Sequence, residues 1–188
     1  APSWDLIVVG GGNAGLPTAI FAAQRGARVL IIEAAGQVGG TLFLSTGQMS
    51  AAGTKLQHSK GIEDTPQSHY DDVMRISGNT ADPALVRLAV ENAAPVFDWL
   101  TDHGFEALPG HPVTGTTHDP YSKARYAWGP KGGMSILKVL NEQLAPLIAS
   151  GRVTVLTQTR VVELIQDRDG TVTGVVAAGA GGNPQRHL

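Results

Sequence analysis

Three glycines, spaced as Gly10-x-Gly12-x-x-Gly15, follow directly on the apolar run Leu6–Val9. A short continuous run of this kind is typical of a strand buried on both faces of a parallel sheet. Apolar residues then recur at helical spacing over Ala14–Arg25, and a second apolar strand follows over Arg28–Ile32. This order predicts a right-handed βαβ unit in which the two strands are parallel and the helix packs on their sheet.

The same glycines have the spacing of an adenine-dinucleotide-binding turn. In such a turn the first glycine permits the tight bend, the second lets the backbone approach a pyrophosphate, and the third lets helix and strand pack closely. The helix start would offer free N–H groups to the phosphates. Glu33 lies 18 residues after Gly15, where an acidic side chain accepts ribose hydroxyls and repels the 2′-phosphate of NADP. The alternatives are FAD, NAD and a glycine-rich turn with no ligand.

Composition excludes several classes of protein. The chain has 188 residues, which suits one domain, and no cysteine, which excludes disulfides and thiolate metal sites. The formal net charge of −2 offers no broad field for nucleic acid or an anionic membrane. No apolar run reaches the ~18 residues of a membrane span, and no signal peptide is visible, so the expected location is the cytoplasm.

The middle of the chain carries two helix-start signals. Asp64-Thr65-Pro66 is one, and Asp82-Pro83, an N-cap residue followed by Pro at the first helical position, is the other. We expect the second helix to be kinked or split at Pro95 and to end at His103-Gly104. Its expected buried face consists of Leu85, Leu88, Ala89, Val96 and Leu100.

The last third of the chain is predicted to contain both helix and strands. Residues 105–133 read as turns and short strands, and a helix follows from about Gly133 to Ser150. Val153–Leu156 reads as a strand, and Arg160–Gln166 with Thr171–Ala177 reads as a hairpin around an Asp-Gly turn. The tail from Gly179 shows no periodicity. The fold class predicted is therefore α/β.

A second glycine-rich stretch is more specific than the first. Gly39-Gly40 is followed by Thr41 and then by the small-residue segment Ser45–Met49. With these residues the sequence resembles the fumarate reductase/succinate dehydrogenase flavoprotein family. The resemblance implies that Gly39-Gly40 contacts the FAD pyrophosphate, that the Gly47-Gln48-Met49 loop passes under the isoalloxazine, and that the Val161 backbone contacts the adenine. Members with covalent FAD carry a His at the position of Thr41, so noncovalent FAD is implied.

The resemblance also implies a fold and an activity. The fold is a Rossmann-like FAD-binding domain over residues 1–188, with a parallel sheet and an added β-hairpin. It is expected to be incomplete at the C-terminus, because the family's return strand, substrate-capping domain and C-terminal FAD-binding piece would come later. The activity implied is hydride transfer between flavin and an activated C–C bond of a small carboxylate or enone substrate.

Because the family's catalytic Arg and His lie mainly in those later parts, the catalytic residues are unknown, and we expect the 188 residues alone to be inactive. A catalytically silent dinucleotide-binding fragment and an NAD-dependent dehydrogenase domain remain the alternatives. The residues expected to bind FAD are Gly10, Gly11, Gly12, Asn13, Ala14, Gly15, Glu33, Ala34, Gly39, Gly40, Thr41, Ser45, Thr46, Gly47, Gln48, Met49 and Val161.

Other side chains allow two interpretations each. His111, His118 and Asp119 could form a metal or acid–base site, or could simply be solvated or locally hydrogen-bonded. Arg125, in the run Arg125-Tyr126-x-Trp128, could clamp a substrate carboxylate, or could be a surface arginine beside a packed aromatic pair. Lys131 could hold an anion at the following helix start, or be an ordinary loop lysine.

Overall fold

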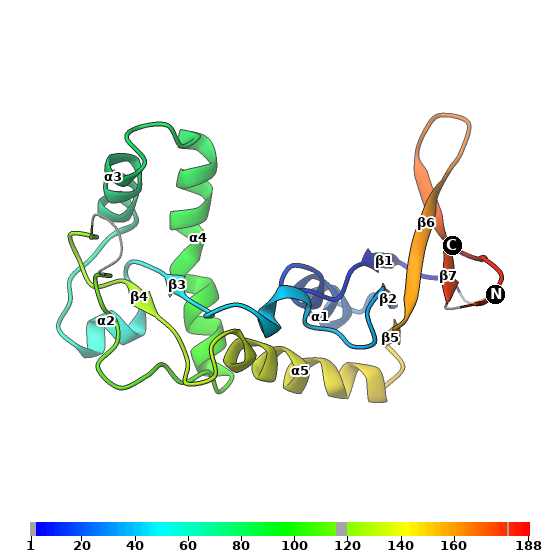
Figure 1. Ribbon diagram of the computed structural model, residues 1–188, viewed down its shortest axis with the longest axis horizontal. Coiled ribbons are helices and arrows are strands. Elements are labelled where there is room, and N and C mark those ends of the chain that lie inside the picture. The colour runs from blue at the N-terminus through cyan, green and yellow to red at the C-terminus, as the bar shows by residue number, and fades with distance from the viewer. Residues whose placement is uncertain (1–2, 116–119, 180) are drawn as a thin grey trace. The chain divides into compact units, whose positions relative to one another are not determined.

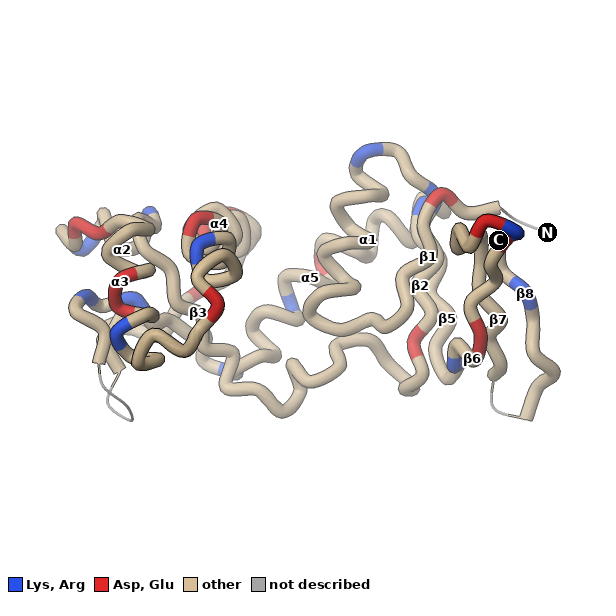
Figure 2. Tube along the Cα trace, turned by 90° about the horizontal axis from the view of Figure 1, so that it is seen from above, with Lys and Arg blue, Asp and Glu red and all other residues tan. Residues whose placement is uncertain are grey.

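The computed structural model describes residues 3–115, 120–179 and 181–188 (Figure 1). The chain forms two compact units. The first comprises Ala1–Leu44 and Leu140–Leu188, and the second comprises Ser45–Val139. Acidic and basic residues are interspersed along the described chain (Figure 2), in keeping with its formal net charge of −2.

A three-stranded parallel sheet is the framework of the first unit. Its strands β1 (Leu6–Val9), β2 (Val29–Ile32) and β5 (Val153–Leu156) lie in the order β1-β2-β5. Leu6 lies opposite Val29, and Val29 lies opposite Val153. The predicted parallel pairing of the first two strands is therefore confirmed.

Burial differs between the two strands that the sequence predicted to be doubly buried. All four residues of β2 are buried, because this strand is central and has a neighbour on each side. On β1, Val9 is 57% exposed and Ile7 is only partly buried. The expectation for β1 was wrong, because this strand is the edge of the sheet within the described residues.

Helix α1 (Gly15–Gln24) joins β1 to β2 and buries the face that the sequence predicted. Pro17 sits in its first turn, where an absent N–H has no intrahelical role. The helix ends at Arg25, and Gly26 continues in the left-handed region with a φ of 98°. Its buried residues are Leu16, Ala19, Ile20 and Ala23.

A second sheet in the first unit contains the predicted hairpin. Strands β6 (Thr159–Gln166) and β7 (Val172–Gly179) are antiparallel (Figure 1). The tail adds a short third strand, β8 (Gln185–His187), which pairs with β7 and which the sequence did not predict. Val175 and Ala177 of β7 pack in one buried cluster with Leu30 and Ile32 of β2, so the hairpin is part of the core of this unit.

The second unit is mainly helical. It contains α2 (Lys55–Ser59), α3 (Pro66–Ile76) and α4 (Pro83–Asp102), and a two-stranded antiparallel pair of β3 (Met49–Ser50) and β4 (Tyr126–Ala127). Helix α5 (Gly133–Ala149) begins in this unit and ends in the first, whereas the 3-10 turn η1 (Gly40–Phe43) belongs to the first.

Both helix starts predicted in this region are confirmed. The Thr65 hydroxyl accepts a hydrogen bond from the Ser68 N–H at 3.1 Å. The Asp82 carboxylate accepts from the N–H groups of Ala84 and Leu85 at 2.8 and 3.1 Å. A proline follows each cap at the start of its helix. These caps satisfy N–H groups that no intrahelical carbonyl can reach.

Helix α4 corrects the expected buried face and one of the two effects expected of Pro95, the split. It is continuous through Pro95 and is not split. Pro95 and Glu91, whose carbonyl loses its donor, are both exposed, so water can replace the missing bond. The buried residues are Val90, Phe97 and Leu100, so of the expected face only Leu100 is buried. The others are exposed, namely Leu85, Leu88, Ala89 and Val96. The helix ends at His103, as predicted.

None of the helices within the described ranges has the length and apolarity that a membrane crossing requires.

Candidate functional site

Two glycines of the first motif are required by the protein's own backbone. Gly10 has a φ of 99°, a conformation that favours glycine. A Cβ added to Gly15 would lie 1.9 Å from the carbonyl oxygen of Gly10, so any side chain there would collide with the backbone of the turn. Gly10 therefore permits the turn, and Gly15 permits the close approach of α1 to it.

Gly12 is different, because neither backbone conformation nor packing requires a glycine there. Its φ lies outside the left-handed region. An added Cβ would meet one heavy atom, the Cα of Gly40 at 4.0 Å, which is an ordinary contact. The described residues thus leave open space at Gly12, as expected if a bound group approaches the backbone there.

The Gly39-Gly40 pair lies against this turn. The Gly39 N–H donates a 2.7 Å hydrogen bond to the Gly11 carbonyl. A Cβ on Gly40 would come within 3.2 Å of the Gly12 Cα, and both residues of the pair have positive φ values, of 126° and 51°. The structure therefore brings together the two glycine segments that the sequence identified separately.

The start of α1 adds hydrogen-bond donors to this turn. Ala14 is the N-cap residue and provides no side-chain cap. Among the described residues, the N–H groups of Gly12, Asn13 and Ala14 have no acceptor. Free N–H groups at the positive end of a helix dipole fit a phosphate.

Glu33 follows β2 and is held by two backbone groups. Its Oε2 accepts from the Gly11 N–H at 2.8 Å, and its Oε1 accepts from the Ala35 N–H at 2.7 Å. Each carboxylate oxygen retains a second lone pair, so the group can also accept ribose hydroxyls. The turn, the helix start and this carboxylate together fit an adenine dinucleotide.

Of the other residues predicted to bind in the first unit, three are exposed and Val161 is half-buried. Asn13, Ala34 and Thr41 are exposed. Val161 pairs with Ala177, and the register of the hairpin shifts directly after it. This register shift could not be predicted from the sequence.

The predicted loop Ser45–Met49 belongs to the second unit, where it packs on the turn that begins α5. The Ser45 carbonyl accepts from the Gly133 N–H at 2.9 Å, and the Ser45 hydroxyl accepts from the Gly47 N–H at 2.9 Å. A Cβ on Gly47 would lie 2.5 Å from the carbonyl carbon of Gly132. Two glycine-rich stretches therefore touch backbone to backbone, a contact that the sequence did not predict. Thr46 and Gln48 are exposed, and Met49 enters β3.

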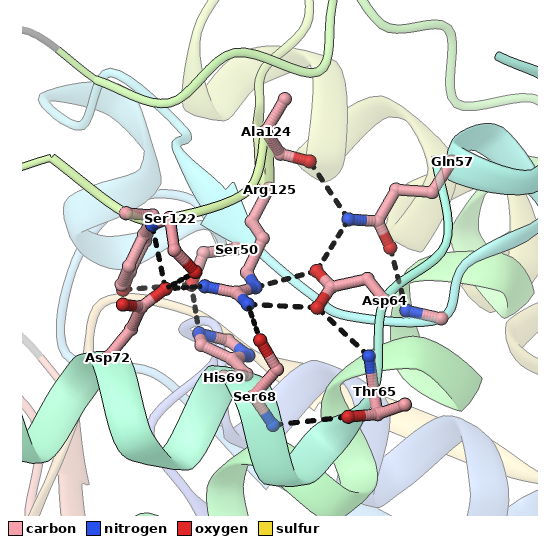
Figure 3. A network of polar contacts seen from close by, with 12 residues as sticks. Ser50, Gln57, Asp64, Thr65, Ser68, His69, Asp72, Ser122, Ala124 and Arg125 are labelled. Atoms are coloured by element: carbon pink, nitrogen blue, oxygen red, sulfur yellow. Dashed lines mark hydrogen bonds and ion pairs between the residues drawn. The ribbon is translucent and has the colours of Figure 1, made fainter. Parts of the chain in front are cut away.

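Arg125 corrects both interpretations made from the sequence. It is 2% exposed, so it is not a surface arginine. Its Nε and Nη2 donate to the two oxygens of Asp64 at 2.7 and 2.8 Å, and its Nη1 donates to Asp72 (Figure 3). Its guanidinium is therefore satisfied by carboxylates of the chain itself and is not free to clamp a substrate. Ser68 accepts a further bond from Nη2 at 2.9 Å.

Hydrogen-bond donors around the two carboxylates, Arg125 among them, lower the pKa of each. Burial opposes the charged form of Asp64, but hydrogen bonds from Arg125 and Gln57 outweigh it, so the pKa of Asp64 is lowered. Burial opposes the charge of Asp72 in the same way, and donors from Ser122, Arg125 and Arg75 lower its pKa strongly. The buried cation is therefore balanced by two anions, which is the condition for burying such groups.

His69 lies at the edge of this network. Its Nε2 lies 3.1 Å from the Ser50 hydroxyl, and its ring meets Tyr121 edge-on, with centroids 5.3 Å apart. Its Nδ1 is buried and has no hydrogen-bond partner among the described residues. Burial, and then the positive charge of Arg125, lower the pKa of His69 to about 4, so the imidazole is neutral at pH 7.

His111 is buried and locally hydrogen-bonded, not solvated. Its Nδ1 lies 3.1 Å from the Leu108 carbonyl, and its ring packs against Trp128 at 4.1 Å. His118 and Asp119 lie outside the described residues. Within the described part of the chain, no three His, Asp or Glu side chains are grouped as metal ligands.

The chain is similar in sequence to known FAD-dependent reductases. Residues 5–187 match a family described as "FAD binding domain". The chain is 31% identical over 175 residues to "Fumarate reductase (cytochrome)" of Shewanella frigidimarina, covering 93% of this chain and 30% of that protein. It is 31% identical over 183 residues to "Urocanate reductase" of Eggerthella lenta, covering 92% of this chain and 28% of that protein.

Solved structures agree with these relatives. The open conformation of a flavocytochrome c3 fumarate reductase matches with a TM-score of 0.81 and 26% identity. That match covers 100% of this chain and 32% of the larger one. The chain thus spans about a third of the length of the proteins it resembles, and the family model that it matches is that of an FAD-binding domain. The chain belongs to the FAD-binding-domain family of the fumarate reductase-like flavoproteins.

Proposed function

We propose that this chain forms the FAD-binding part of a flavin-dependent reductase that transfers hydride to an activated C–C double bond. The observation that carries this proposal concerns Gly12. Neither the backbone conformation nor the packing of the described residues requires a glycine at this position. When bound, FAD supplies hydride transfer between its N5 and a substrate carbon.

The residues of the chain have distinct roles in this proposal. The Gly12 backbone and the free N–H groups at the start of α1 hold the pyrophosphate. Glu33, fixed by the Gly11 and Ala35 N–H groups, accepts the ribose hydroxyls. The Val161 backbone contacts the adenine, and the Ser45–Met49 loop contacts the isoalloxazine. Thr41 cannot form a histidyl link, so the cofactor is held without a covalent bond.

The substrate class follows from the two relatives. Fumarate and urocanate both carry a C–C double bond conjugated to a carboxylate, which makes the distal carbon a hydride acceptor. We therefore propose a small unsaturated carboxylate as the substrate of the intact enzyme. The chain spans about 30% of such relatives, and its buried Arg125 is fully engaged by Asp64 and Asp72. The groups that bind and protonate the substrate are therefore proposed to lie outside these 188 residues.

An anaerobic assay tests whether the chain binds FAD without reducing a substrate. The purified 188-residue chain is mixed with reduced FAD and either fumarate or urocanate, and flavin reoxidation is followed at its visible absorption band. We expect that the chain binds FAD and that flavin reoxidation is no faster than with free reduced FAD. Turnover comparable to that of an intact reductase would contradict the proposal that the substrate-binding and proton-donating groups lie outside these 188 residues. Failure to bind FAD would contradict the proposal that the chain is an FAD-binding part.

A further inference from the structure

The loop Ser45–Met49 is fixed at both of its ends within the second unit. At one end, Ser45 and Gly47 pack on the backbone of Gly132 and Gly133, with Ser45 accepting from the Gly133 N–H at 2.9 Å. At the other end, Met49 enters β3, which pairs with β4 through two residues only. A two-residue pair is too short to hold its own geometry. Whatever fixes β4 therefore also fixes the end of the loop.

Arg125 directly precedes β4 and anchors it from both backbone and side chain. Its carbonyl accepts from the Ala51 N–H at 3.4 Å, next to β3, and its own N–H donates to the Val113 carbonyl at 3.0 Å. Its guanidinium forms ion pairs with Asp64, before α3, and with Asp72, within α3. The side chains of Arg125 and Asp64 are both 0% exposed.

Further contacts tie the same strand pair to this centre. The Gln57 amide donates to the Ala124 carbonyl at 2.8 Å and to Asp64 at 2.9 Å. Ser122, three residues before Arg125, donates to Asp72 from both its N–H and its hydroxyl, at 2.8 and 2.6 Å. Figure 3 shows these donors converging on the two carboxylates around the guanidinium. The approach to β4 is thus tied to α2 and α3 along its length.

We propose that Arg125 is a positioning residue for the flavin-contacting loop. By fixing β4, and through it β3, the Arg125–Asp64–Asp72 network would set the backbone of Gly47, Gln48 and Met49, the residues proposed to contact the isoalloxazine. This inference rests on the proposed function, because the loop matters only if FAD binds. It assigns to the network a role in recognising the isoalloxazine half of FAD and none in recognising the adenosine half.

Measuring the binding of ADP and of FAD distinguishes the contributions of the two halves of the cofactor. ADP carries the adenosine and pyrophosphate that the glycine turn is proposed to hold, whereas FAD adds the isoalloxazine. The dissociation constants of both are measured for the wild-type chain and for Arg125→Lys, which keeps the charge but loses the two-pronged contact with Asp64. Lys55→Met is the matched control, because Lys55 forms an exposed ion pair with Asp102 in the same unit.

Arg125→Lys is expected to weaken FAD binding about tenfold, equivalent to ~1.4 kcal/mol, and to leave the affinity for ADP unchanged. The visible circular dichroism of bound flavin is expected to change as well, which a purely structural role would not produce below the melting temperature. Lys55→Met is expected to match wild type in all three measurements. Equal weakening of FAD and ADP, or no change in either, would overturn the inference.

A second, less disruptive variant tests the inference if Arg125→Lys does not fold. Ser122→Ala removes one donor to Asp72 and leaves both ion pairs in place. It is expected to weaken FAD binding severalfold without affecting ADP, and the same affinity for both ligands as in wild type would overturn the inference. Failure of the proposed function itself is distinguishable, because the wild-type chain would then bind neither ligand.

Discussion

Single residues of the glycine turn differ in what their missing side chains allow. Gly10 is needed for its φ of 99°, and Gly15 for the approach of α1, but Gly12 is needed for neither. The same residue type therefore serves folding at two positions, and at the third we propose that it gives a ligand access to the backbone. This distinction leads to opposite expectations for stability and for binding.

Replacing Gly12 and Gly15 by Ala separates the two roles in the ligand-free chain. Gly12→Ala is expected to leave the free energy of unfolding unchanged or to raise it by up to about 1 kcal/mol, since Ala restricts the unfolded chain. Gly15→Ala is expected to lower it by at least about 1–3 kcal/mol through overpacking against Gly10. Urea denaturation followed by circular dichroism measures both. Equal destabilisation by the two substitutions would show that Gly12 is a structural glycine.

His69 predicts a specific pH dependence. Its pKa lies near 4 in the folded state because of burial and the charge of Arg125, although Asp64 and Asp72 partly oppose this. The unfolded state, with an ordinary pKa near 6.5, takes up a proton first as the pH falls. The stability that neutral His69 contributes is therefore complete above pH 6.5 and is lost between about 6.5 and 4.

His69→Gln removes this titration. We expect the free energy of unfolding of the variant to fall less steeply between pH 6.5 and 4 than that of the wild type. Below pH 4 both proteins lose stability, because Asp64 and Asp72, whose folded pKa values are lowered, become protonated on unfolding. Denaturation curves at a series of pH values measure the slopes. An unchanged slope in the variant would contradict the burial of a neutral His69.

At the scale of elements, local signals predicted the start and end of α4 better than its buried face. The caps at Thr65 and Asp82 act through hydrogen bonds over two or three residues, so their signal is contained in the local sequence. The face that α4 buries depends on what packs against it. Phe97, for example, stacks edge-on with Phe105, which follows the end of the helix, at 5.9 Å. The apolar pattern of α4 alone did not contain that information.

The N-cap of α4 is a local sequence signal that substitution can test directly. Asp82→Ala removes the acceptor of the Ala84 and Leu85 N–H groups and is expected to lower the free energy of unfolding by about 1 kcal/mol. Asp82→Asn retains a capping oxygen and is the matched control, expected to lie close to wild type. Thermal or urea unfolding measures both variants. If Asp82→Asn lost as much stability as Asp82→Ala, the charge and not the cap would be responsible.

At the scale of the whole molecule, the sequence predicted the pieces but not all their contacts. The βαβ unit and the hairpin follow from apolar runs and turn residues, which are local. The pairing of Arg125 with Asp64 and Asp72 joins residues 61 and 53 positions apart, and nothing in the local pattern marks it. The same is true of Gly47 on Gly132 and of β8 on β7. The glycine turn was predictable because its chemistry lies within one short segment.

The central claim is that the open space at Gly12 receives the pyrophosphate of FAD. Isothermal titration of FAD into the wild-type chain and into Gly12→Val tests it most directly, after circular dichroism has shown that the two apoproteins are equally folded. We predict saturable binding to the wild type and at least tenfold weaker binding to the variant, because the valine side chain would occupy the space next to the backbone. Equal affinity of the two proteins for FAD would contradict the account.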